Sequence, residues 1–298
     1  MKYDFLDPAA LSRLGAIPLE ARQAMTGNIA GRHRSPHRGS SVEFAEYRKY
    51  VQGDDTRRLD WKAYARSDRY YIKEFEADTN LRAYFVLDAS GSMGFTASHE
   101  ARIQFARKLA ATLSYLIIDQ GDAAGLSVCQ EKIHVEIPPT RRAAHLNHIF
   151  EVLSNTEPSG ETGLVEALHT IAEKVAQRAL VIILSDLFCN TAEFGDALQH
   201  LRYRKHDVAV FHMLDPQEIA FDFERPHRFV DMEDKTSIVA EPTLIADEYQ
   251  QAMTEFMTTV KSKCHDVQAD YHLITTDQDY EGIVHDFLTN RLTKKGRS

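Results

Sequence analysis

The order of apolar and polar runs along this 298-residue chain predicts an α/β fold. From residue 82 onward, short apolar and β-branched runs, typical of buried strands, alternate with longer runs that have helical spacing. This alternation predicts a doubly wound, mainly parallel sheet with helices on both faces. The predicted strands are 83–88, 124–129, 133–137, 179–185, 207–213 and 268–274. The predicted helices are 100–119, 142–154, 164–177, 192–203, 243–262 and 279–291.

Two places depart from simple alternation. The runs 124–129 and 133–137 are separated only by Gln130–Lys132, which predicts an antiparallel hairpin at the edge of the sheet. Residues 214–242 interrupt the pattern of strands and helices, and we expect them to form an insertion.

The N-terminal part of the chain has a different pattern. Residues 8–29 have helical spacing, and 42–50 and 70–75 read as strands. We therefore expect an N-terminal segment of residues 1–79, packed on a main domain of residues 80–298.

Composition and charge narrow the function classes. The formal net charge of −9 argues against a general nucleic-acid binder. No apolar stretch approaches the roughly 20 residues needed to span a bilayer, and the N-terminus does not read as a signal peptide. Cys129, Cys189 and Cys264 are isolated cysteines, as expected in a reducing compartment. We expect a cytoplasmic protein without a membrane segment.

The chemistry that the sequence predicts begins at Asp88. The buried run 83–87 ends at this carboxylate, and Ser90 and Ser92 follow before a helix-like segment begins. A carboxylate and two hydroxyls on a strand-to-helix loop form an all-oxygen donor set. Such donors suit Mg²⁺ or Mn²⁺ better than zinc or copper.

Two further donors are expected at the same edge of the sheet. Asp186 follows the second apolar run, 180–184, and Thr162 precedes the predicted helix 164–177. In a doubly wound sheet, ligands bind beyond the carboxyl ends of the strands, near the point where the strand order reverses. The predicted metal site is therefore formed by Asp88, Ser90, Ser92, Thr162 and Asp186.

The order Asp-x-Ser-x-Ser, then Thr, then Asp resembles the metal-ion-dependent adhesion site of the von Willebrand factor A fold. The resemblance covers roughly residues 80–215. It implies that the metal leaves one coordination position open and that a carboxylate of a partner protein completes it. The same five residues would then be the metal ligands, and binding would depend on Mg²⁺ or Mn²⁺.

A second resemblance involves the block from Gly31 to Glu76. Together with 228–233 and 246–249, this block resembles the bacterial family called domain of unknown function 58, which pairs it with a von Willebrand A-like domain. The resemblance implies a MoxR-type AAA+ ATPase, or its client protein, as partner, and a role as an adaptor or chaperone-like accessory. The motifs that carry it are His33-Arg34-Ser35, Glu43-Phe44-Ala45-Glu46-Tyr47-Arg48, Gly53-Asp54-Asp55, Arg57-Arg58-Leu59-Asp60-Trp61-Lys62 and Lys73-Glu74-Phe75.

The block is dense in charged side chains, and we expect arginine–carboxylate pairs within it. Arg57 or Arg58 would pair with an aspartate of 54–60, and Arg48 with Glu43 or Glu46. Two interpretations stay open: the block anchors the N-terminal segment to the sheet domain, or it forms a partner surface.

We therefore expect a non-enzymatic, metal-dependent protein-interaction module. Two alternatives use the same residues: a metal-dependent hydrolase, for which no general base is evident, and a structural protein with a vestigial site. We further expect Asp88 and Asp186 at exposed strand ends, so that replacing either by alanine abolishes metal-dependent binding without unfolding the protein. Ser92→Ala should weaken metal affinity less, because it removes a neutral ligand.

Overall fold

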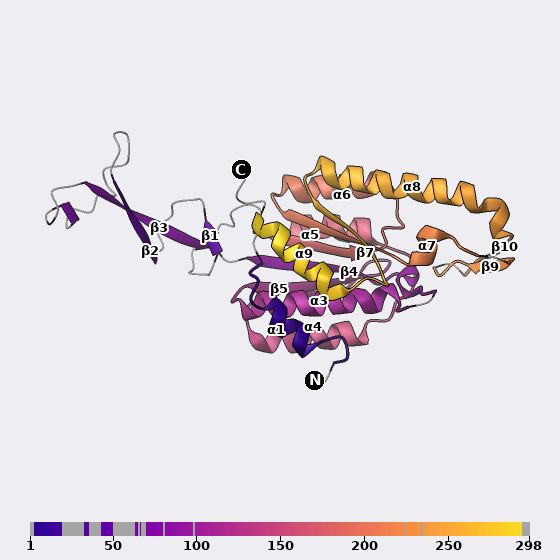
Figure 1. Cartoon of the computed structure of the whole chain (residues 1–298), viewed down its shortest axis with the longest axis horizontal. Helices are drawn as coiled ribbons and strands as arrows, with labels where there is room; N and C mark the ends of the chain where they lie inside the picture. The colour runs from indigo at the N-terminus through magenta and orange to yellow at the C-terminus, as the bar shows by residue number, and fades with distance from the viewer. Residues whose placement is uncertain are drawn as a thin grey trace. The chain divides into compact units, whose positions relative to one another are not determined.

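The computed structural model describes residues 3–19, 33–35, 43–49, 63–64, 66, 70–79, 81–97, 99–223, 225–233 and 235–293 (Figure 1). For 33–35, 43–49 and 72–79 only the backbone is described, so the arginine–carboxylate pairs predicted within 43–60 lie outside the described side chains. The chain forms two compact units, residues 23–81 and residues 1–22 with 82–298. Residues 1–22 thus group with the sheet, which the division into 1–79 and 80–298 did not anticipate.

The unit of residues 23–81 contains a three-stranded antiparallel sheet. Its strands are β1 (His33–Ser35), β2 (Glu43–Lys49) and β3 (Tyr71–Thr79), in the order β1-β3-β2. Both strands predicted here, 42–50 and 70–75, are present.

The helix predicted over 8–29 is described only as far as residue 19, and within 8–19 it ends at Leu14. Helix α1 spans Pro8–Leu14; the Asp7 side chain accepts from the Ala9 N–H, and Gly15 caps the C-terminal end. Residues 15–19 are not helical, and 20–29 lie outside the described residues. The predicted helix is therefore confirmed over Pro8–Leu14 and is wrong for 15–19.

The other unit is built on a six-stranded sheet in the order β11-β8-β7-β4-β5-β6. All neighbouring strands are parallel except β5 and β6, which pair antiparallel at the edge, as predicted for the hairpin. The strands are β4 (Arg82–Asp88), β5 (Ala123–Cys129), β6 (Ile133–Thr140), β7 (Leu180–Ser185), β8 (Asp207–Leu214) and β11 (Asp270–Thr275).

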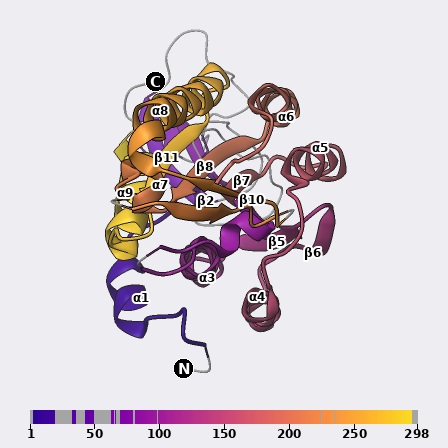
Figure 2. The same ribbon diagram turned by 90° about the vertical axis from the view of Figure 1, so that its right-hand side faces the viewer.

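Helices cover both faces of this sheet (Figure 2). One face is covered by α5 (Leu164–Lys174), α6 (Thr191–Tyr203) and α8 (Pro242–Asp266), which share a core cluster with alternate strand residues such as Tyr84 and Val86. The opposite face is covered by α3 (Arg102–Asp119), α4 (Ala143–Asn155) and α9 (Tyr280–Thr293). Successive side chains of a strand point to opposite faces, so both faces are apolar. The predicted fold class is confirmed.

Residues 214–242 do not extend the main sheet. They contain the short helix α7 (Pro216–Ala220) and a separate antiparallel pair, β9 (His227–Val230) and β10 (Ser237–Ala240). Within the described part of the chain, no helix combines the length and the apolar character needed to cross a bilayer.

The strand order places a topological switch point between β4 and β7. From β4 the chain moves to β5 and β6 on one side, then returns to β7, β8 and β11 on the other. The carboxyl ends of β4 and β7 therefore border the crevice in which doubly wound folds bind their ligands.

Candidate metal site

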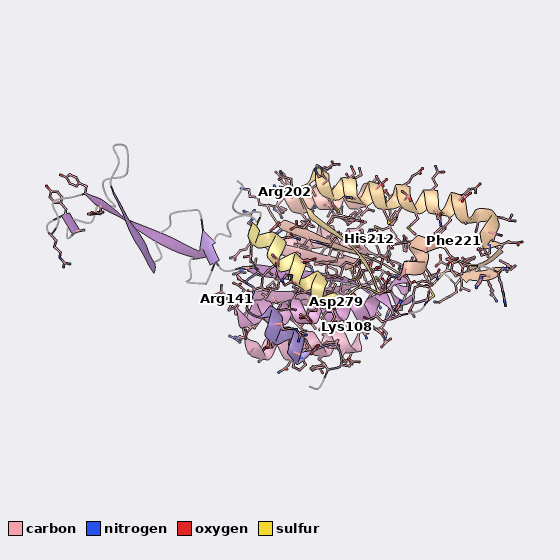
Figure 3. All side chains as sticks on the ribbon, viewed as in Figure 1. Lys108, Arg141, Arg202, His212, Phe221 and Asp279 are labelled. Atoms are coloured by element: carbon pink, nitrogen blue, oxygen red, sulfur yellow. The ribbon has the colours of Figure 1, made fainter. Side chains whose placement is uncertain are left out.

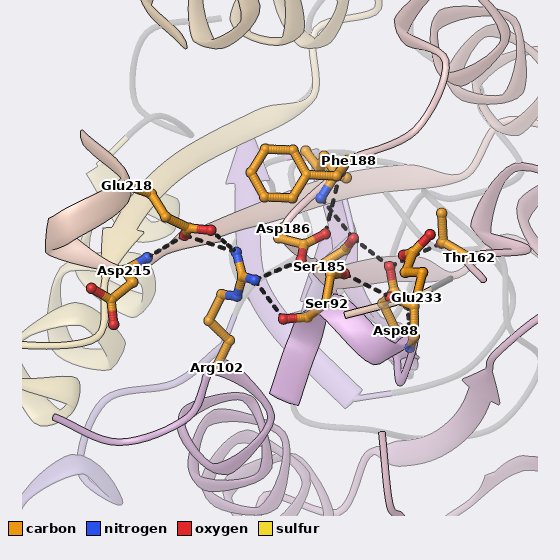
Figure 4. Close-up of polar contacts among 12 residues, drawn as sticks. Asp88, Ser92, Arg102, Thr162, Ser185, Asp186, Phe188, Asp215, Glu218 and Glu233 are labelled. Atoms are coloured by element: carbon orange, nitrogen blue, oxygen red, sulfur yellow. Dashed lines mark hydrogen bonds and ion pairs between the residues drawn. The ribbon is translucent and has the colours of Figure 1, made fainter. Parts of the chain in front are cut away.

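The structure brings the five predicted donors together at this switch point (Figure 4). The Asp88 Oδ1 atom accepts a hydrogen bond of 3.0 Å from the Ser90 N–H, and Oδ2 accepts one of 3.2 Å from the Thr162 hydroxyl. The hydroxyl oxygens of Ser90 and Ser92 lie 3.1 Å apart. Asp186, which follows β7, is close enough to Asp88 to perturb its ionisation.

The electrostatics of the site disfavour two ionised carboxylates. Burial, and then the nearby charge of Asp186, raise the pKa of Asp88 from 3.8 to about 6. Hydrogen bonds from Ser185 and Ser90 oppose this shift only in part. A cation between the two carboxylates would remove the repulsion.

The expectation that Asp88 and Asp186 lie at exposed strand ends is wrong. Each has an exposed fraction of 1%. The strands do end at this edge, but the loops into η2 (Gly91–Gly94) and α5 and the turn between β9 and β10 pack there, since Gly91 lies against Met232 and Thr162 donates to Asp88. Substitutions here therefore act on stability as well as on binding.

The donor chemistry fits a hard divalent cation. The Asp186 Oδ2 atom is buried without a hydrogen bond, although the Arg102 guanidinium lies 3.3 Å away. Because the same guanidinium also pairs with Glu218, it offsets the buried charge of Asp186 only in part. Among the described residues, no three His, Cys, Asp or Glu side chains are grouped to hold a metal, so hydroxyl oxygens would have to complete the shell. Mg²⁺ accepts such a site because it usually keeps several waters.

Ser185, the last residue of β7, is a functional residue that the sequence reasoning missed. Its hydroxyl donates to the Asp88 Oδ2 atom at 2.7 Å and accepts from the Leu187 N–H at 2.9 Å. It therefore joins the ends of β4 and β7 and fixes the orientation of the Asp88 carboxylate. Its position directly before Asp186 was the available signal.

Arg102 is the second residue that the sequence reasoning missed. This 1% exposed side chain pairs with both Glu218 carboxylate oxygens, at 2.9 and 3.0 Å, and with Asp186 (Figure 4). Its guanidinium also lies 5.5 Å from the ring centroids of Phe95 and Phe188. An arginine in the first turn of a helix opposes the helix dipole, and this was the only signal in the sequence.

Glu233 is the third such residue. It lies in the turn between β9 and β10, and Figure 4 places it beside Asp88, Ser92 and Thr162. Burial, followed by the charges of Asp186 and Asp88, raises the pKa of Glu233 to about 7. The Glu233 carboxylate therefore lies beside three of the residues that would bind a cation, Asp88, Ser92 and Thr162.

Gly163 explains how Thr162 reaches Asp88. A Cβ atom at Gly163 would lie 2.1 Å from the carbonyl oxygen of Glu131, in the β5–β6 turn. Its N–H donates to the Gln130 carbonyl at 2.6 Å. Only glycine allows this approach of two backbones, which holds the loop before α5 against the sheet edge.

An apolar pocket of about 820 Å³ adjoins the candidate site. Ser92, Arg102 and Glu233 line the side nearest the donors. Elsewhere, Phe221, labelled in Figure 3, stacks on Tyr249 with ring centroids 4.0 Å apart and on Phe229 at 5.7 Å. The pocket thus combines aromatic walls with a polar end at the metal donors.

Comparison with solved structures supports the fold and nothing finer. A structure of an aerotolerance-related membrane protein from Bacteroides fragilis matches with a TM-score of 0.51 and 13% identity, over 74% of this chain and all of that chain. Two further matches have lower TM-scores. BatB from Bacteroides thetaiotaomicron has a TM-score of 0.47 and 14% identity, over 72% of this chain and 100% of that chain. The SpRpn10 VWA domain has a TM-score of 0.41 and 8% identity, over 71% of this chain and 95% of that chain.

The sequence comparisons identify the family. The uncharacterized proteins Mb1516 of Mycobacterium bovis and Rv1480 of Mycobacterium tuberculosis are each 27% identical over 223 residues, which cover 74% of this chain and 69% of theirs. The family model described as "Protein of unknown function DUF58" matches residues 46–262, more than half of the chain. The chain therefore belongs to the DUF58 family.

Proposed function

We propose that this protein is a metal-dependent protein-interaction module. A Mg²⁺ or Mn²⁺ ion would be held by Asp88, Ser90, Ser92, Thr162 and Asp186. The main support is the buried pair Asp88 and Asp186 at the switch point, where Asp186 Oδ2 accepts no hydrogen bond and shares the Arg102 guanidinium with Glu218. When bound, the cation would supply an electrophilic position for a carboxylate oxygen of another protein.

The chain's own residues would prepare the site for this role. Ser185 and Thr162 orient Asp88 through their hydroxyl groups, and Arg102 offsets part of the negative charge of Asp186. The aromatic pocket beside Ser92 would receive apolar side chains that flank the partner's carboxylate. We therefore propose an acidic segment with apolar neighbours as the partner's binding element.

We further propose that the partner is a MoxR-type AAA+ ATPase or one of its client proteins. This rests on membership of the DUF58 family and on the association implied by the resemblance of the N-terminal block. The protein would then act as an adaptor or chaperone-like accessory. The block of residues 31–76 would serve either as an anchor or as a second contact surface.

Calorimetric titration tests the metal site directly. Mg²⁺ and Mn²⁺ are titrated into the chelator-treated full chain, with Asp88→Ala alongside. Binding by the wild type but not by the variant is the expected result. A pull-down with a purified MoxR-type ATPase in Mg²⁺ or in EDTA then tests the partner. Absence of metal binding by the wild type would favour a vestigial site.

A metal-dependent hydrolase is the second candidate, because Glu233 could supply the general base that the sequence did not reveal. The support for this role is the position of Glu233 beside Ser92 and Thr162; a bound cation would lower its pKa, which burial and the charges of Asp186 and Asp88 raise in the cation-free protein. Hydrolysis of p-nitrophenyl phosphate with Mn²⁺, lost in Glu233→Gln, would favour this candidate over a binding module.

A further inference from the structure

The turn between β9 and β10 lies directly against the loop that carries the serine donors. A Cβ atom at Gly91 would lie 2.4 Å from the Met232 carbonyl oxygen, far closer than real side chains approach. Glycine at this position, between Ser90 and Ser92, therefore lets the backbone of the turn pack on the donor loop. The turn belongs to the insertion, so a segment remote in sequence from Asp88 closes over the site.

Within this turn, Glu233 directs its carboxylate toward the donors. Its Oε1 atom is buried and has no hydrogen-bond partner, while its side chain interacts with the Ser92 hydroxyl. The charges of Asp186 and Asp88 act on it directly. Glu233 is only partly buried, but a buried carboxylate oxygen that lies near two other carboxylates and has no hydrogen bond is unfavourable unless a cation lies among them.

The hairpin that carries Glu233 is held to the rest of its unit mainly through Phe229 of β9, which packs on Phe221 and Phe223. β9 and β10 pair with each other and not with the main sheet. Val230, Ile238 and Val239 are 46%, 65% and 73% exposed. The turn itself is ordered locally, because Asp231 accepts from the Glu233 N–H at 2.7 Å and Lys235 donates to the Met232 carbonyl at 2.7 Å. Movement of the hairpin would therefore separate Phe229 from Phe221 and Phe223, whereas the exposed side chains of Val230, Ile238 and Val239 would lose little packing.

From these contacts we infer that the β9–β10 turn is an internal occupant of the metal site. As they lie, Glu233, Asp88 and Asp186 are not grouped to hold a metal. When the cation is present, Glu233 would turn its carboxylate toward it from the edge of the site and keep out the carboxylate of another protein until the hairpin moves away. This inference rests on the proposed metal-dependent function and adds its regulation.

The test compares Glu233→Gln with the wild type and with Glu241→Gln. Glu241 is an exposed carboxylate that follows β10, so its variant removes the same charge from the same insertion. Mn²⁺ is titrated calorimetrically into each full-length protein, with and without acetate as the carboxylate probe. Hydrogen–deuterium exchange of residues 231–236 is then followed with and without Mn²⁺.

The inference predicts about tenfold weaker Mn²⁺ binding by Glu233→Gln and no change in Glu241→Gln. Mn²⁺ should slow exchange of the turn in the wild type but not in Glu233→Gln, and acetate should strengthen Mn²⁺ binding only in Glu233→Gln. Equal Mn²⁺ affinity in all three proteins, with no metal-dependent protection of the turn, would overturn the inference alone. Absence of Mn²⁺ binding by the wild type would overturn the proposed function and the inference together.

Discussion

Replacing Asp88 by asparagine should stabilise the metal-free protein at neutral pH. Asparagine keeps an acceptor for the Ser90 N–H, and its amide can donate to the Ser185 hydroxyl oxygen in place of the present bond. The variant removes a buried charge without removing volume. The repulsion between Asp88 and Asp186 and the cost of burying the Asp88 charge are both lost.

The magnitude follows from the ionisation of Asp88. A rise in its pKa from 3.8 to about 6 corresponds to about 3 kcal/mol of unfavourable free energy for the ionised form in the folded protein. A group whose pKa is raised by folding contributes full stability below pH 3.8 and loses it as the pH rises through about 6. Above pH 7 without divalent cations, the free energy of unfolding of Asp88→Asn should therefore exceed that of the wild type by up to about 3 kcal/mol.

Urea unfolding of both proteins in EDTA, from pH 4 to pH 8, measures this difference. The gap should open as the pH rises through about 6, and close when Mn²⁺ is added, because only the wild type gains from the cation. Asp207→Asn is the matched control. Asp207 is also a buried carboxylate, but it forms an ion pair of 2.9 Å with the Arg291 guanidinium. Replacing Asp207 by asparagine should therefore destabilise the protein. An Asp88→Asn variant less stable than the wild type in EDTA at pH 8 would refute the reasoning.

Three further predictions concern the donors and the packing that positions them. Ser92→Ala should weaken Mn²⁺ binding less than Asp88→Ala, because it removes a neutral ligand; equal losses by calorimetry would contradict this ranking. Arg291→Met should cost about 3 to 5 kcal/mol in urea unfolding, because it leaves two buried carboxylates without their cation, whereas a cost below about 1 kcal/mol would argue against the ion pairs. Gly163→Ala should cost about 1 to 3 kcal/mol and also weaken Mn²⁺ binding, since its Cβ atom would meet a backbone carbonyl at 2.1 Å. Unchanged thermal stability in Gly163→Ala would show that the loop adapts freely.

The sequence determined the sheet and the edge at which the donors lie. Apolar runs such as 83–87 and 180–184 are local signals, and a polar residue at the end of each run marks the carboxyl end of a strand. The parallel order then follows from the intervening helices. For this reason, the sequence alone predicts that Asp88, Thr162 and Asp186 lie at one edge of the sheet.

Only the tertiary structure decided how deeply the donors are buried and what surrounds them. Burial of Asp88 and Asp186 depends on loops and a turn that close over the strand ends, and sequence spacing does not report such closure. Arg102 and Glu233 reach the site from α3 and from the insertion, whose packing against β4 and β7 is set by the whole fold. Local pattern fixes which residues end a strand, whereas charge balance and access depend on contacts between segments far apart in the chain.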